Sequence, residues 1–171
     1  MNHSISVFDN FYSDPDKVRE YALGLEYNVV GNYPGKRSSE QLGDNHNLGV
    51  KKFFRDYFER DILNWSNGYN GSFQYVLENE ITWIHKDKNE YNTHAALIFL
   101  HPNPPEGDYG TTLFEHKETK SYFCPDDETL IQRIENDGQN LSKWSIMDYV
   151  GYRYNRLILY DSQIIQNVPP H

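Results

Sequence analysis

The stretch TWIHKDKNEYNTHAALIFL, residues 82–100, carries a histidine and an aspartate directly before an apolar run. The run at residues 94–100 has the length and composition of a buried strand. Along a strand, residues two positions apart point to the same face with α-carbons about 6.6 Å apart, so His85 and Asp87 can bind one cation together. The alternative is a solvated polar bend between two strands. The stretch therefore predicts β-structure and offers two ligands of a metal site.

The second half of the chain reads mainly as strands separated by turns. Three more segments have a two-residue period or a continuous apolar run: SFQYVLENEITWIH (72–85), GTTLFEH (110–116) and NRLILYDSQIIQNV (155–168). The segment HPNPPEGDYG (101–110) holds three prolines and two glycines, which excludes a central strand. Short antiparallel strands with few helical crossovers favour a sandwich or jelly roll over a doubly wound sheet.

Helices are predicted mainly in the first part of the chain. Asp14 and Pro15 form a helix start, because aspartate is a preferred N-cap and proline a preferred first helical residue. Apolar residues recur at helical spacing in residues 47–63, and acidic capping residues before an apolar face predict a further helix within 125–138. The segment YPGKRS (33–38) reads as a loop.

The composition limits the class of protein. A chain of 171 residues fits one domain, here a helical lead at residues 1–70 and a strand-rich core at 72–171. The single cysteine, Cys124, excludes an internal disulfide, and no apolar run approaches the ~20 residues of a membrane span. The net charge of -9 has the wrong sign for binding a phosphate backbone. We therefore expect a cytoplasmic protein that binds neither nucleic acid nor membrane.

An ordered set of motifs resembles the prolyl-hydroxylase-like branch of the iron(II)- and 2-oxoglutarate-dependent oxygenases. The motifs are FDNFYSDPD (8–16), YPG (33–35), WIHKD (83–87), AALIFL (95–100), GDYGTTLF (107–114) and NRLILYDS (155–162). The resemblance implies a mainly β fold, a double-stranded β-helix (jelly roll) with N-terminal helices packed on one sheet. It implies Fe(II) and 2-oxoglutarate as cofactors, and His85 and Asp87 as the first two iron ligands, a donor set that suits non-haem iron.

The third ligand is open between two residues. The family carries a histidine a few residues beyond the NRLILYDS segment, and this chain has Gln166 there. An amide oxygen is a poorer donor than imidazole to a borderline metal, so Gln166 would weaken the site. His171 is the other candidate, and the chain would have to bend back at Pro169 and Pro170 to bring it to the metal.

The cosubstrate anchor is also open. The family has an arginine on the last core strand, beyond the distal ligand, and the sequence ends at His171 before that strand. Lys117 could bind 2-oxoglutarate instead, although a solvated strand-end lysine is the simpler reading. A missing last strand would leave a sheet edge open, which implies either a truncated longer chain or a homodimer that closes the edge.

Two functions follow from these readings. One is an oxygenase that hydroxylates a small molecule or a peptide side chain. The other is a non-catalytic jelly-roll binding protein with a degenerate metal site. A third interpretation is that the chain is a truncated piece of an active oxygenase. His94, His101 and His116 are interpreted as strand-end residues rather than ligands.

Overall fold

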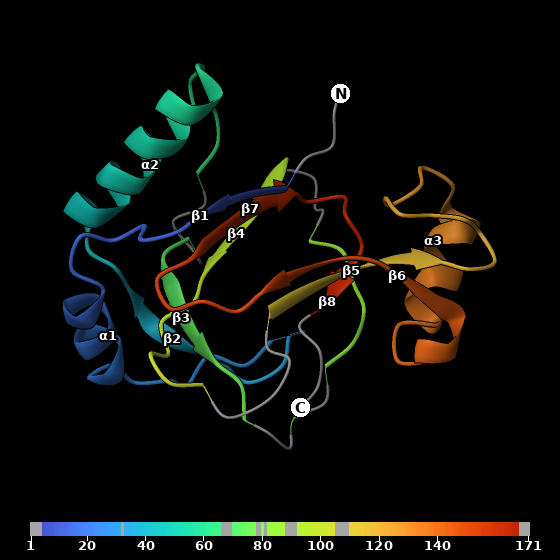
Figure 1. The fold of residues 1–171 in the computed structure, drawn as a ribbon, viewed down its shortest axis with the longest axis horizontal. Coiled ribbons are helices and arrows are strands. Elements are labelled where there is room, and N and C mark those ends of the chain that lie inside the picture. The colour runs from blue at the N-terminus through green and yellow to red at the C-terminus, as the bar shows by residue number, and fades with distance from the viewer. Residues whose placement is uncertain are drawn as a thin grey trace. The chain divides into compact units, whose positions relative to one another are not determined.

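The computed structural model shows a mixed α/β chain with three small antiparallel sheets and three α-helices in the part it describes (Figure 1). The residues described are 5–31, 33–65, 70–77, 80, 82–87, 92–104 and 110–167, without the side chains of 44–46. The chain divides into two compact units, one formed by Met1–Arg19 with Glu78–His171 and the other by Glu20–Leu77. Within the described ranges, the strands form no closed barrel.

The first sheet of the larger unit is built around β7 (Leu157–Asp161). It pairs antiparallel with β1 (Ile5–Phe8) on one side and with β4 (His94–Ile98) on the other. The first four residues of β7 are all buried. A central strand covered on both faces needs a continuous apolar run, which explains the sequence LILY.

The second sheet of this unit has β5 (Gly110–His116) at its centre, between β6 (Trp144–Gly151) and β8 (Gln166–Asn167). A single bridge between His85 and Gln166 continues the pairing beyond β8. The histidine segment is therefore held along the edge of this sheet.

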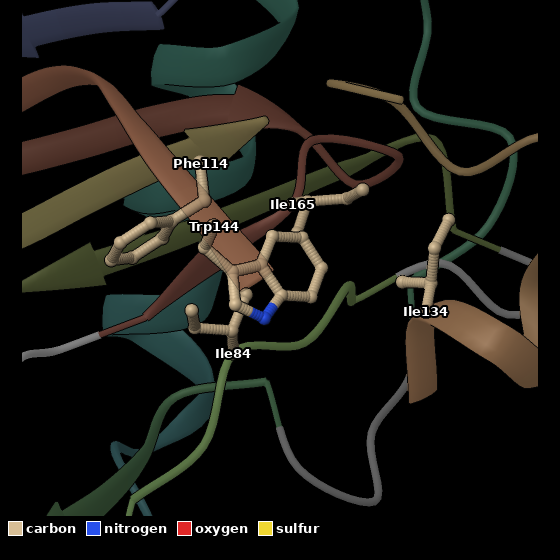
Figure 2. Close-up of a cluster of buried hydrophobic side chains, with 5 residues drawn as sticks. All are labelled: Ile84, Phe114, Ile134, Trp144 and Ile165. Carbon is tan, nitrogen blue, oxygen red and sulfur yellow. The ribbon is translucent and has the colours of Figure 1, made fainter. Parts of the chain in front are cut away.

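Side chains of β5 enter two different cores, because successive residues of a strand point to opposite faces. Leu113 packs with Ile158, Tyr160 and Ile164, so this core lies between the facing sides of the two sheets. Phe114 belongs to the core on the other side, which α3 (Glu128–Asn136) covers (Figure 2). That second core consists of Ile84, Phe114, Ile134, Trp144 and Ile165.

The predicted helices are confirmed, although the middle one both begins and ends earlier than predicted. The first, α1 (Pro15–Leu23), begins at the predicted proline. In α3, the Asp127 carboxylate accepts hydrogen bonds from two backbone N–H groups of the first turn, as acidic caps do. The middle helix, α2 (Asp44–Phe58), stops earlier than predicted because Glu59 adopts a left-handed conformation with φ 52°.

The smaller unit contains a strand where a loop was predicted. Strand β2 (Lys36–Gln41) pairs antiparallel with β3 (Ser72–Tyr75), so the loop prediction for 33–38 is wrong from Lys36 onward. Gly35 precedes β2 with φ 75°, and a Cβ there would lie 1.8 Å from the Tyr75 carbonyl oxygen, so only glycine fits.

Two predicted long strands are shorter in the structure. The strand predicted for 72–85 ends at Tyr75, and part of its remainder lies outside the described residues. The strand predicted for 155–168 divides into β7 and β8. A turn separates the two, in which Asp161 Oδ1 accepts a hydrogen bond from the Gln163 N–H at 2.9 Å. In the described part of the chain, no helix has the length and apolar character needed to cross a bilayer.

Candidate functional site

Three of the predicted site residues, His85, Asp87 and Gln166, come together at the edge of the second sheet. The backbones of His85 and Gln166 exchange two hydrogen bonds, of 2.9 and 2.8 Å. The Gln166 side-chain nitrogen Nε2 lies 3.1 Å from His85 Nε2 and 3.2 Å from Asp87 Oδ2. The structure therefore brings His85 and Asp87 together, and the β8 pairing adds Gln166.

The proton on the His85 ring is fixed by its neighbours. His85 Nδ1 lies 2.9 Å from the Trp83 carbonyl oxygen, which can only accept, so Nδ1 carries the hydrogen. His85 Nε2 is then an acceptor, and the Gln166 NH₂ group donates to it. A histidine that binds a metal through Nε2 has this same tautomer.

The Asp87 carboxylate has two differently engaged oxygens. Oδ2 accepts hydrogen bonds from the Tyr160 hydroxyl at 2.6 Å and from Gln166 Nε2 at 3.2 Å. Oδ1 lies 3.7 Å from His85 Nε2. Backbone bonds hold the residue in place, since the Asp87 N–H donates to the Ser162 carbonyl at 3.1 Å.

Tyr160 is a site residue that the sequence reading missed. It sits in the apolar run LILY, whose pattern indicates only a core strand. Burial raises the pKa of the Tyr160 hydroxyl well above its ordinary value of 10.0, and the Asp87 charge raises it further. The hydroxyl therefore keeps its proton and donates to Asp87.

The three side chains of the site differ in their exposure to solvent. The side chains of His85 and Asp87 are 33% and 32% exposed, whereas Gln166 is buried. His85 and Asp87 are thus within reach of solvent, while the pairing with β8 fixes the position of Gln166 beside them. Such a combination of access and rigidity is common in binding sites.

The donor atoms fit one divalent cation. His85 Nε2 and Asp87 Oδ1 are 3.7 Å apart, and two metal–donor bonds of about 2.1 Å each can span up to about 4.2 Å. Rotation of the Gln166 amide by half a turn would exchange its NH₂ for its carbonyl oxygen. That oxygen would be the third donor to the cation, and it carries no net charge. Among the described residues, no group of three or more His, Cys, Asp or Glu side chains could hold a metal ion, so the amide is needed to complete the set.

Lys117, the predicted cosubstrate anchor, is not brought to this group. Lys117 Nζ donates to the Ser142 carbonyl at 2.8 Å. Leu113 of β5 lies opposite Gln166. Lys117 is four residues further along the chain, just after β5 ends, and four residues of a strand span about 13 Å. His171 lies outside the described residues.

His116 ends β5, as predicted, but it is fully buried. Its Nε2 lies 3.1 Å from Asp137 Oδ2 and its Nδ1 lies 2.9 Å from Thr119 Oγ1. The ring packs edge-on against Trp144 with centroids 4.9 Å apart. These contacts join β5 to the C-terminal end of α3, so His116 is a structural residue.

Comparison with protein-family models, with curated proteins and with solved structures finds no match to this chain. The functional argument therefore rests on the geometry of His85, Asp87 and Gln166.

Proposed function

We propose that this protein is an oxygenase of the iron(II)- and 2-oxoglutarate-dependent type, in which His85, Asp87 and Gln166 hold one divalent cation. The observation that carries the proposal is the convergence of His85 Nε2, the Asp87 carboxylate and the Gln166 amide within 3.1–3.7 Å of one another. The proposed fold is a double-stranded β-helix, which agrees with two sheets that share a core around Leu113 and Ile158. The proposed substrate is a small molecule or a peptide side chain.

Each residue has a distinct part in this proposal. His85 gives a neutral imidazole lone pair whose direction is set by the Trp83 carbonyl. Asp87 supplies the negative charge, and Gln166 supplies an amide oxygen after rotation of its side chain. The chemistry of bound iron(II) with 2-oxoglutarate and O₂ is the hydroxylation of a C–H bond, with release of succinate and CO₂. The buried base formed by Gln166 and Tyr160 keeps water from the inner side of the site.

A second function, a non-catalytic binding protein with a degenerate metal site, is favoured by one observation. The Gln166 NH₂ group donates to both His85 Nε2 and Asp87 Oδ2, so the acceptors are satisfied without a cation. Acceptor atoms that are already hydrogen-bonded gain less from binding an ion. The two functions differ in metal affinity and in turnover.

Anaerobic calorimetric titration with Fe(II), followed by an assay for succinate from 2-oxoglutarate and O₂, separates the two functions. The oxygenase predicts binding of one Fe(II) per chain and succinate formation, with both lost in His85→Ala. His101→Ala is the matched control, since His101 is exposed and makes no contact with the site in the described structure. Binding without succinate would favour the binding protein, and no difference between wild type and His85→Ala would refute the site itself.

A further inference from the structure

Tyr160 stands where the core of the protein meets the candidate metal site. Its ring packs with Leu113, Ile158 and Ile164 between the two sheets, and it is only 3% exposed. Its hydroxyl reaches Asp87 Oδ2 at 2.6 Å, a shorter contact than the 3.2 Å from Gln166 to the same oxygen. Hydrogen bonds to an ionised acceptor at this length are among the stronger ones in proteins.

The two oxygens of Asp87 are unequal for this reason. A carboxylate can bind a cation through one oxygen or through both. Oδ2 accepts from the Tyr160 hydroxyl at 2.6 Å, and this hydrogen bond stays in place when the Gln166 amide rotates to present its oxygen to the cation. Oδ1 is the oxygen that lies toward His85 Nε2.

We propose that Tyr160 is a positioning residue that makes Asp87 bind a cation through Oδ1 alone. Tyr160 itself touches neither cation nor substrate. Its hydroxyl holds Oδ2 to the buried side, which fixes the plane of the carboxylate and turns Oδ1 toward His85 Nε2. The inference rests on the proposed metal site. It adds that Asp87 coordinates through one oxygen and that Tyr160 determines which one.

Tyr160→Phe is the direct test, because it removes the hydroxyl and leaves the ring in its core. Tyr152→Phe is the matched control, since the Tyr152 hydroxyl bonds to the backbone of His101 instead. Co(II) is the probe, followed by calorimetry and by its visible absorption spectrum. The spectrum depends on the number of donor atoms, which a merely structural role of Tyr160 would not change.

We expect Tyr160→Phe to bind Co(II) about 10- to 100-fold more weakly than wild type, the usual cost of losing an outer partner of a ligand. We also expect a weaker visible spectrum, because a freed Oδ2 can join the coordination and raise the coordination number. Tyr152→Phe should match wild type in both readouts. If Tyr160→Phe binds Co(II) with wild-type affinity and shows the wild-type spectrum, the positioning role of Tyr160 is overturned, while the proposed metal site is not.

A second measurement needs no variant and covers the case in which Tyr160→Phe does not fold. The infrared difference spectrum of wild type with ¹³C-labelled aspartate, recorded with and without Co(II), reports how the carboxylate binds. Widely separated carboxylate stretching bands, as for one-oxygen binding, are expected, and closely spaced bands would overturn the proposal. Absence of any Co(II) binding to wild type would overturn the metal site and the role of Tyr160 together.

Discussion

His85 and Gln166 face each other across one antiparallel bridge, with backbone hydrogen bonds in both directions and side-chain nitrogens 3.1 Å apart. The pairing puts the side chain of residue 166 directly beside the histidine that would bind a metal. A side-chain change at residue 166 that keeps the backbone N–H therefore acts directly on the candidate site.

Gln166→His should strengthen metal binding. Imidazole is a better donor than an amide oxygen to a borderline divalent metal, and the bridge keeps the new ring beside His85. We expect at least a tenfold gain in Co(II) affinity by calorimetry. Gln166→Leu is the matched control, since it keeps the volume and removes every donor, and it should weaken binding. Equal affinity in the two variants would show that residue 166 takes no part in the site.

His116→Leu should destabilise the fold. The change removes a fully buried ring that bonds to Asp137 Oδ2 and Thr119 Oγ1, and it leaves both oxygens without that partner. A loss of about 2–3 kcal/mol in the free energy of unfolding is expected, measured by urea denaturation. His116→Gln can still donate toward Asp137 and should lose less. The interpretation would be contradicted if the glutamine variant were the less stable of the two.

Thr111→Val should stabilise the fold slightly. Thr111 is fully buried in β5, and its hydroxyl has no hydrogen-bond partner among the described residues. A buried hydroxyl without a partner costs about 1–3 kcal/mol, and valine has the same shape without the polar atom. We expect a gain of about 1 kcal/mol in thermal or urea unfolding. Thr111→Ser keeps the hydroxyl and loses a methyl group, so it should destabilise, and a stable serine variant would argue against this reading.

Sequence patterns predict the elements that have a local signal, such as a continuous apolar run or a helix cap. The apolar run of β7 and the caps of α1 and α3 are of this kind, whereas β4 forms where its apolar run predicts a strand but is only partly buried. Strand β2, KRSSEQ, has no apolar alternation because it belongs to a two-stranded sheet and buries only Ser38. Local pattern therefore gave no sign of it.

The candidate site divides in the same way. His85 and Asp87 share one segment, so their spacing offers two ligands, and the family resemblance then names them as iron ligands. Tyr160 acts through an oxygen, yet the three residues before it are all core residues, and its bond to Asp87 joins positions 73 apart in the chain. Such a contact depends on the register of β7 against the histidine segment, which no local pattern contains.

Asp9→Asn should lower stability at neutral pH and matter less in acid. The Asp9 carboxylate accepts hydrogen bonds from Arg156 at 2.7 and 3.1 Å and from Arg153 at 2.8 Å. The hydrogen bonds from Arg156, followed by the charges of both arginines, lower the pKa of Asp9 below its ordinary 3.8. A carboxyl group with a lowered folded-state pKa stabilises the fold above its unfolded pKa, and it loses that effect as the pH falls through the folded value.

The difference in unfolding free energy between wild type and Asp9→Asn should therefore be constant from neutral pH down to about pH 5 and shrink below pH 3.8. Urea denaturation at a series of pH values measures it. Asp61→Asn, at an exposed carboxylate, is the control for the change in net charge. A difference that grew on acidification would mean that the pKa of Asp9 is raised in the folded protein, and would contradict the ion pair as the cause.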